Sequence, residues 1–159
     1  MKEIKLQTTI RLAQSEELSE EDRLLVQRAI EATASSYSPY SHFAVGAALR
    51  LADGTIVIGS NQENAAFPSG LCAERTAIFA AGATHPDQAV TTLAIAARNE
   101  AGLTAEPASP CGACRQVILE VEQRYKCPVR ILLYGTNGVY IINSVRDLLP
   151  LCFVDESMR

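Results

Sequence analysis

The residues best suited to chemistry in this 159-residue chain are three cysteines and one glutamate in two short motifs. Cys111 and Cys114 form a Cys-x-x-Cys motif, and Cys72 stands two residues before Glu74. A Cys-x-x-Cys motif alone is ambiguous, because two thiolates at this spacing can bind one zinc ion or act as a redox dithiol. The additional Cys-x-Glu motif favours zinc, and we expect Cys72, Cys111 and Cys114 to be its ligands.

Three protein ligands leave zinc an open position for water, which distinguishes a catalytic site from a closed structural one. Glu74 could reach that water without binding the metal, as a carboxylate that moves protons must. Three thiolates on a zinc dication leave one net negative charge. This charge should keep the pKa of the zinc-bound water high. We expect the helix N-termini at the cysteines, together with Arg75 and Arg115, to offset this charge.

The sequence pattern predicts an α/β fold, with a mixed sheet and helices packed on its faces. Residues 1–18 have no clear period and form a poorly specified N-terminal arm. Both cysteine motifs are predicted to lie at helix starts. The expected helices cover residues 19–34, 72–83, 111–125 and a short 145–149, and the expected strands cover residues 43–51, 55–59, 90–97, 129–134 and 139–142.

Composition and charge exclude several classes of protein. Hydrophobic residues make up 48% and charged residues 20%, which predicts a single globular domain over residues 1–159. No apolar run approaches the roughly 18 residues of a membrane span, and the start has no secretory signal pattern, so we expect no membrane partner and a cytoplasmic location. The net charge of −4 disfavours nucleic acid as a partner. In a reducing compartment, five cysteines point to metal binding or catalysis rather than disulfides.

Five segments together resemble the small, homotetrameric type of cytidine deaminase, of the cytidine and deoxycytidylate deaminase superfamily. The five segments occur in the same order as in that family, and the two cysteine motifs among them match the zinc-deaminase signature. The matching segments are residues 39–49, 61–65, 70–77, 109–117 and 147–150. The resemblance implies a three-layer cytidine-deaminase-like fold, in which a five-stranded mixed sheet lies between helices and its last two strands are antiparallel.

The same resemblance implies roles for individual residues. One Zn²⁺ per chain would be bound by the three cysteines, with Glu74 as the general acid and base. Asn61 and Glu63 would hydrogen-bond the ribose hydroxyls, although by themselves they also fit turn residues after a strand. The remaining expected substrate-binding residues are Phe43 against the pyrimidine, Ala73, and Phe153 in the 151–159 tail, which would reach a neighbouring subunit.

The implied reaction is hydrolytic deamination of cytidine and 2'-deoxycytidine to uridine and 2'-deoxyuridine in pyrimidine salvage, by a homotetramer acting on a small nucleoside. If the cysteines bind zinc, two alternatives to a catalytic site remain. One is a closed structural site with Cys127 or Cys152 as the fourth ligand, and the other is a zinc-stabilised interaction module without catalytic activity. Related deaminases act on cytosine-containing antibiotics or on cytosines in RNA or DNA, and Asn61 with Glu63 favours plain nucleosides instead. Phe67 stands where many family members carry tyrosine, so any hydrogen bond from that hydroxyl is absent.

Overall fold

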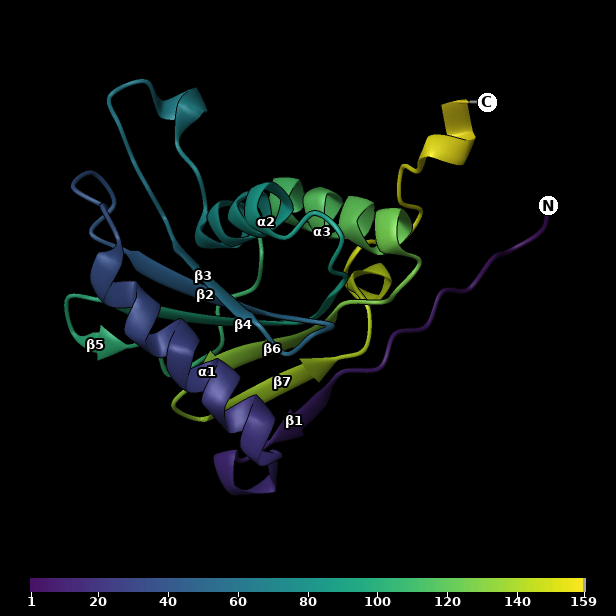
Figure 1. The fold of residues 1–159 in the computed structure, drawn as a ribbon. Helices are drawn as coiled ribbons and strands as arrows, with labels where there is room; N and C mark the ends of the chain where they lie inside the picture. The colour runs from purple at the N-terminus through teal and green to yellow at the C-terminus, as the bar shows by residue number, and fades with distance from the viewer. Residues whose placement is uncertain (159) are drawn as a thin grey trace.

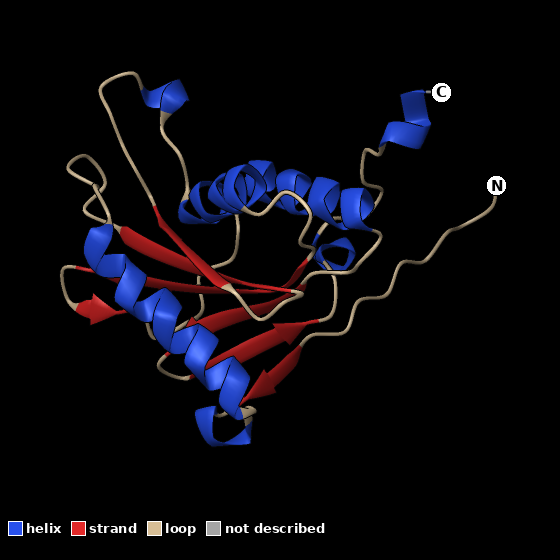
Figure 2. Cartoon of the chain, viewed as in Figure 1, coloured by secondary structure: helices blue, strands red, loops and turns tan. Residues whose placement is uncertain are grey.

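The computed structural model describes residues 1–158 and contains one mixed sheet with helices on both faces (Figures 1 and 2). Within this part of the chain the sheet has seven strands in the order β1-β7-β6-β4-β2-β3, with β5 paired to β4. The strands are β1 (Arg11–Ala13), β2 (Ala44–Leu51), β3 (Ile56–Ser60), β4 (Val90–Asn99), β5 (Gly102–Leu103), β6 (Arg130–Gly135) and β7 (Gly138–Ile142). The α-helices are α1 (Glu20–Ala32), α2 (Ala73–Thr84) and α3 (Gly112–Tyr125).

The expected strand count of five is wrong, because the described sheet has seven strands. The five predicted strands are all present as β2, β3, β4, β6 and β7, and the last two are antiparallel as expected. The two additional strands pair with strands already in place: β1 adds to the edge of β7, and β5 turns back onto the end of β4. Strand β1 has three residues and strand β5 has two. Such short strands form by backbone pairing and are too short to show an alternating side-chain pattern in the sequence.

The helices form two layers around the sheet. Helix α1 lies on one face, where Leu25 and Ala29 pack against Ala48 and Ala94 of the sheet. Helices α2 and α3 lie together on the opposite face, as Figure 1 shows, and bury Ala77 and Ile118. The expected three-layer arrangement is therefore confirmed, and burial on both faces of β4 explains why its residues 93–97 are all apolar.

Strand direction brings the beginnings of α2 and α3 to the same edge of the sheet. Strands β3 and β4 run in the same direction, because each pairs antiparallel with β2. Helix α2 follows β3 and helix α3 follows β4 and β5 in the chain, so both helices begin near the carboxyl ends of these strands. This edge is where open α/β sheets commonly bind ligands.

Gly59 in β3 allows α2 to pack closely on the sheet. A Cβ atom at this position would lie 2.6 Å from the carbonyl oxygen of Ala73, and closer still to the amide nitrogen of Ala77. Both contacts are with helix backbone, which cannot rotate away. The first turn of α2, which carries the Cys-x-Glu motif, is therefore held against β3 at the distance that glycine permits.

None of the helices in the described chain combines the length and the apolar character that crossing a membrane requires.

Candidate metal centre and active site

The sulfur atoms of Cys72, Cys111 and Cys114 form one cluster, in which all lie within 4.8 Å of one another. The Sγ atoms of Cys72 and Cys111 are 3.9 Å apart. Two sulfurs that bind a tetrahedral zinc ion at about 2.3 Å are roughly 3.8 Å apart, so this separation fits zinc. Among the described residues, neither Cys127 nor Cys152 belongs to the cluster. This arrangement favours a three-sulfur site over the closed four-cysteine alternative.

The N-termini of two helices position these sulfurs. Cys72 is the N-cap of α2, and its carbonyl accepts a hydrogen bond from the Thr76 amide at 3.0 Å. Cys111 is the N-cap of α3, and Cys114 is fully buried in the first turn of the same helix. Helix N-termini favour negative charge, which stabilises thiolates at these positions. The predicted helix starts at both motifs are confirmed.

The pKa values of the Cys72 and Cys114 thiols are shifted in opposite directions. Hydrogen bonds from Cys114, from Arg75 and from Cys111 lower the pKa of the Cys72 thiol to about 5, despite its partial burial. The Arg75 guanidinium donates to the Cys72 sulfur over 3.6 Å. The Cys114 thiol, which donates to Cys72 and lies close to Glu74, has its pKa raised above the ordinary value. The hydrogen bonds within the cluster therefore favour the thiolate form at Cys72 over the thiolate form at Cys114.

Glu74 lies in the first turn of α2 and is only 4% exposed. Burial raises the pKa of its carboxyl group, and the neighbouring Cys72 thiolate raises it further. A raised pKa makes a carboxylate a better proton acceptor, and the protonated carboxyl group can then return the proton. Glu74 thus has the environment expected of a general acid and base.

A cavity of about 250 Å³ opens beside the sulfur cluster. It brings together six of the residues singled out in the sequence, namely Phe43, Asn61, Glu63, Cys72, Glu74 and Cys111. Five more residues line it that sequence reasoning missed as site residues: Ser41, Val45, Ile95, Ala108 and Ser109. Ser41, Val45 and Ser109 fall within matched segments and could have been selected there. Ile95 is one apolar residue in a buried strand, and nothing in the sequence distinguishes it.

Asn61 and Glu63 hold the segment that carries Phe43. The Asn61 carboxamide accepts from the Val45 amide at 2.8 Å and donates to the Phe43 carbonyl at 2.9 Å. One Glu63 carboxylate oxygen accepts from the amides of Tyr40 and Ser41 at 2.9 and 3.2 Å. Hydrogen bonds from Ser41 and Tyr40 hold the pKa of Glu63 below its ordinary value. Both residues therefore shape the cavity wall, in addition to lining the cavity.

Three other predicted residues lie outside this cavity lining. Ala73 is fully buried at the start of α2. Phe153 is 57% exposed in the C-terminal tail. Arg115 donates to the oxygen atoms of Pro110, Leu148 and Ser109. Of the two arginines expected near the metal, Arg75 donates to a sulfur of the cluster, whereas Arg115 donates to oxygen atoms of a loop and of the C-terminal segment.

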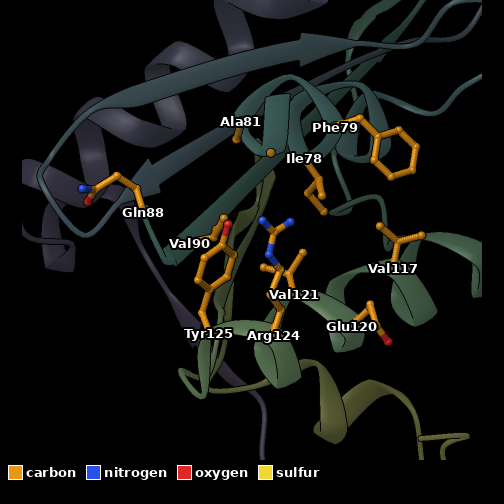
Figure 3. A pocket seen from close by; sticks show the side chains of 11 residues that line it. Ile78, Phe79, Ala81, Gln88, Val90, Val117, Glu120, Val121, Arg124 and Tyr125 are labelled. Atoms are coloured by element: carbon orange, nitrogen blue, oxygen red, sulfur yellow. The ribbon is translucent and has the colours of Figure 1, made fainter. Parts of the chain in front are cut away.

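A second hollow, of about 370 Å³, lies between the later halves of α2 and α3 (Figure 3). Its walls are mostly apolar, with Ile78, Val90, Val117 and Val121 among the residues that line it, and Phe79 at its rim. The cysteines and Glu74 are at the opposite ends of the same helices. Chemistry of the kind predicted from the sequence therefore belongs to the smaller cavity.

Comparison with known proteins agrees with this site. Residues 19–129 match the family model described as the cytidine and deoxycytidylate deaminase zinc-binding region. The chain is 39% identical over 139 residues to a cytidine deaminase of Halalkalibacterium halodurans, covering 86% of this chain and 97% of that protein. It is 41% identical over 135 residues to a cytidine deaminase of Mycobacterium tuberculosis, covering 82% of this chain and 87% of that protein.

The fold has matches among solved structures as well. The crystal structure of cytidine deaminase from Burkholderia pseudomallei superposes with a TM-score of 0.72 at 36% identity, covering 86% of this chain and all of that one. The cytidine deaminase structure from Mycobacterium tuberculosis gives 0.67 at 32% identity, covering 86% and 99%. With the sulfur cluster, the family model and these relatives in agreement, the chain belongs to the cytidine deaminase family of enzymes.

Proposed function

We propose that this protein hydrolyses cytidine and 2'-deoxycytidine to uridine and 2'-deoxyuridine, with release of ammonia and with one zinc ion per chain. The observation that carries the proposal is the three-sulfur cluster beside the buried Glu74 carboxylate, at the wall of a cavity that Phe43 and Glu63 also line. A redox dithiol would not require the third cysteine or the carboxylate.

The sulfur cluster suits zinc, which acts as a Lewis acid and lowers the pKa of water when it is held by three protein ligands. Glu74 then supplies the proton transfers. Its carboxylate takes a proton from the attacking water and gives it to the ring nitrogen next to the amine-bearing carbon. Glu74 also delivers the second proton of that water to the amine, which leaves as ammonia while the ring carbon keeps the oxygen. Water and cytidine thereby balance uridine and ammonia.

A free nucleoside suits the rest of the cavity. Phe43 offers an apolar surface for a pyrimidine ring. Glu63 is a carboxylate with about four acceptor sites, of which the Tyr40 and Ser41 amides occupy two, and the remainder can accept from sugar hydroxyls. The net charge of −4 disfavours phosphorylated substrates and nucleic acid polymers. The cavity therefore favours nucleosides over nucleotides.

We also propose a homotetramer that works in pyrimidine salvage in the cytoplasm. Several large apolar side chains are exposed on the isolated chain, with Phe67 at 71%, Phe153 at 57% and Phe79 at 50%. Exposed apolar patches mark surfaces that another subunit can cover, and these three side chains are the candidates for such contacts. In the tetramer Phe153 of one subunit would reach the cavity of another. Reduced thiols that bind zinc suit a reducing compartment.

The deciding experiment measures zinc content per chain and ammonia release from cytidine for the parent protein and for Glu74→Gln. We expect one zinc per chain in both proteins, and at least a roughly 100-fold lower turnover in the variant, because general acid and base catalysis contributes roughly 100- to 10,000-fold. Glu120→Gln, a change at an exposed position of α3, is the matched control and should keep parent turnover. Parent turnover in Glu74→Gln would refute the assigned role. The mass of the parent in solution tests the tetramer.

A further inference from the structure

The side chain of Arg115 joins two segments that are distant in the sequence. Its Nε donates to the Pro110 carbonyl at 2.9 Å and its Nη2 to the Ser109 hydroxyl at 3.1 Å. Its Nη1 donates to the carbonyl of Leu148 at 2.6 Å. Arg115 itself directly follows Cys114 in the first turn of α3. One guanidinium therefore ties the residues just before Cys111 to the C-terminal part of the chain.

That C-terminal part is itself fastened along α3, and we name residues 144–156 the C-terminal strap. The buried Glu122 carboxylate accepts from the Ser144 hydroxyl and from the Val145 amide at 3.0 Å. Gln116 donates to the Phe153 carbonyl at 3.0 Å, and Gln123 donates to the Glu156 carboxylate at 3.0 Å. Figure 1 shows the start of the strap, in yellow, beside α3. The strap is thus held before and after Leu148, which makes the Leu148 carbonyl a fixed anchor.

The loop that this anchor holds has little other regular structure. Residues 104–111 belong to no helix or strand of the described chain, and Cys111 is exposed. Cys72 and Cys114 are better fixed, since Cys114 is fully buried and the Cys72 sulfur receives the Arg75 guanidinium. Cys111 is therefore the ligand whose position depends most on the loop before it.

We propose that Arg115 is a positioning residue. It links Ser109 and Pro110 to the C-terminal strap and thereby keeps the Cys111 sulfur at metal-binding distance from the sulfurs of the other two cysteines. The inference rests on the proposed zinc site. It differs from a charge-tuning role, because each of the three hydrogen bonds of Arg115 ends on an oxygen of the loop or strap. Retention of the metal then depends on the strap that also carries Phe153.

The two roles predict different behaviour for lysine at this position. Lysine keeps the positive charge, but its single ammonium group cannot reproduce a planar fork that spans two segments. If Arg115 acts through charge, Arg115→Lys should behave as the parent does. If Arg115 acts as a bridge, Arg115→Lys and Arg115→Gln should both loosen Cys111 and release zinc faster.

The experiment follows zinc transfer to a colorimetric chelator from zinc-loaded parent, Arg115→Lys, Arg115→Gln and Gln123→Ala. Gln123→Ala is the matched control, because it removes only the contact at the far end of the strap, while the contacts of Glu122 and Gln116 on either side of Leu148 remain. We expect release at least tenfold faster in both Arg115 variants and within twofold of the parent in Gln123→Ala. The cobalt-substituted proteins add a spectroscopic readout, in which the bands of the thiolate-bound metal should change only in the Arg115 variants.

Parent-like release from Arg115→Lys would overturn the bridging role, and so would equally fast release from Gln123→Ala. If the Arg115 variants do not fold, Ser109→Ala removes one acceptor of the bridge, and it should speed release at least threefold or the proposal is wrong. A parent that takes up no zinc would overturn both this proposal and the proposed function. A parent that retains zinc yet does not deaminate cytidine would refute the function alone, and the release rates would still decide the role of Arg115.

Discussion

Replacing Arg75 with glutamine tests how the protein manages an anionic three-thiolate site. In the structure the Arg75 guanidinium donates to the Cys72 sulfur at 3.6 Å. Three thiolates on a zinc dication carry one net negative charge, which weakens the ion as a Lewis acid. The Arg75 hydrogen bond withdraws charge from sulfur and should partly restore the acidity of the metal. Arg75→Gln removes the charge while it keeps a side chain that can still donate.

The size of the effect follows from that one contact. A hydrogen bond to a charged group contributes about 1.5–3 kcal/mol. Since about 1.4 kcal/mol corresponds to tenfold in rate, its complete loss from the transition state would lower kcat roughly 10- to 150-fold. Arg75 is half-buried and acts through sulfur rather than on the substrate, so only part of this energy reaches the reaction. We therefore expect kcat to fall about tenfold while KM stays near the parent value.

The assay combines steady-state cytidine deamination with zinc content per chain. Arg28→Gln is the control, because Arg28 lies exposed on α1 and pairs there with Glu31. It should leave kcat and zinc content unchanged. Parent kcat in Arg75→Gln at full zinc content would show that the charge of Arg75 is not needed for turnover. Activity that falls only in proportion to zinc would show that Arg75 retains the metal instead of tuning it.

Two further predictions concern the scaffold. The buried Asp22 pairs with Arg50 and Arg130, and Asp22→Asn should lower the free energy of unfolding by about 2–4 kcal/mol in a denaturant titration at pH 7, since it leaves Arg130 without its carboxylate partner and Arg50 with only the exposed Glu21 at 3.8 Å. Burial opposes ionisation of Asp22, but the hydrogen bonds from the two arginines outweigh this effect and hold the pKa of Asp22 below 3.8. The stability that the ionised Asp22 contributes is therefore present above pH 3.8, and the difference in free energy of unfolding between parent and variant should narrow as the pH falls below that value. A difference that stays constant with pH would contradict this reasoning. Gly59→Ala should lower the free energy of unfolding by about 3 kcal/mol, because the added Cβ overpacks against α2. Gly82→Ala should instead raise the melting temperature, because alanine favours a helix over glycine and its Cβ would meet only a side-chain atom of Arg124 at 3.9 Å. Equal melting temperatures for the two glycine variants would refute the close-packing argument.

Local sequence patterns account for several elements of the scaffold around the site. Ser19 stands before three acidic residues, a pattern typical of a helix N-terminus, and it accepts a hydrogen bond from the Asp22 amide at the start of α1. An Asn-Gly pair lies in the turn from Gly135 to Gly138, is typical of a tight hairpin, and joins β6 to β7 as an antiparallel pair. Signals of this kind depend mainly on a few neighbouring residues. The roles assigned to Ala73 and Phe153 through family resemblance stay predictions.

Short-range patterns could not show which chain segments meet. Strand β1 exists because the open edge of β7 offers backbone partners, and the sequence of residues 11–13 carries no sign of that edge. Likewise the partners of Arg115 include Leu148, which lies 33 positions away. The charge-compensating role expected for Arg115 stays a prediction, and the positions of its acceptors are the basis of the bridge that we propose.

The sequence by itself determined the candidates for the chemistry of the site, because the three cysteines and the glutamate in its two motifs are residue types suited to bind a metal and to carry protons. The tertiary structure decided their arrangement. Parallel β3 and β4 bring two helix N-termini to one edge of the sheet, where the Cys72 and Cys111 sulfurs come within 3.9 Å. Side-chain identity is local, but distance and burial depend on the path of the whole chain, and a linear pattern does not contain that path.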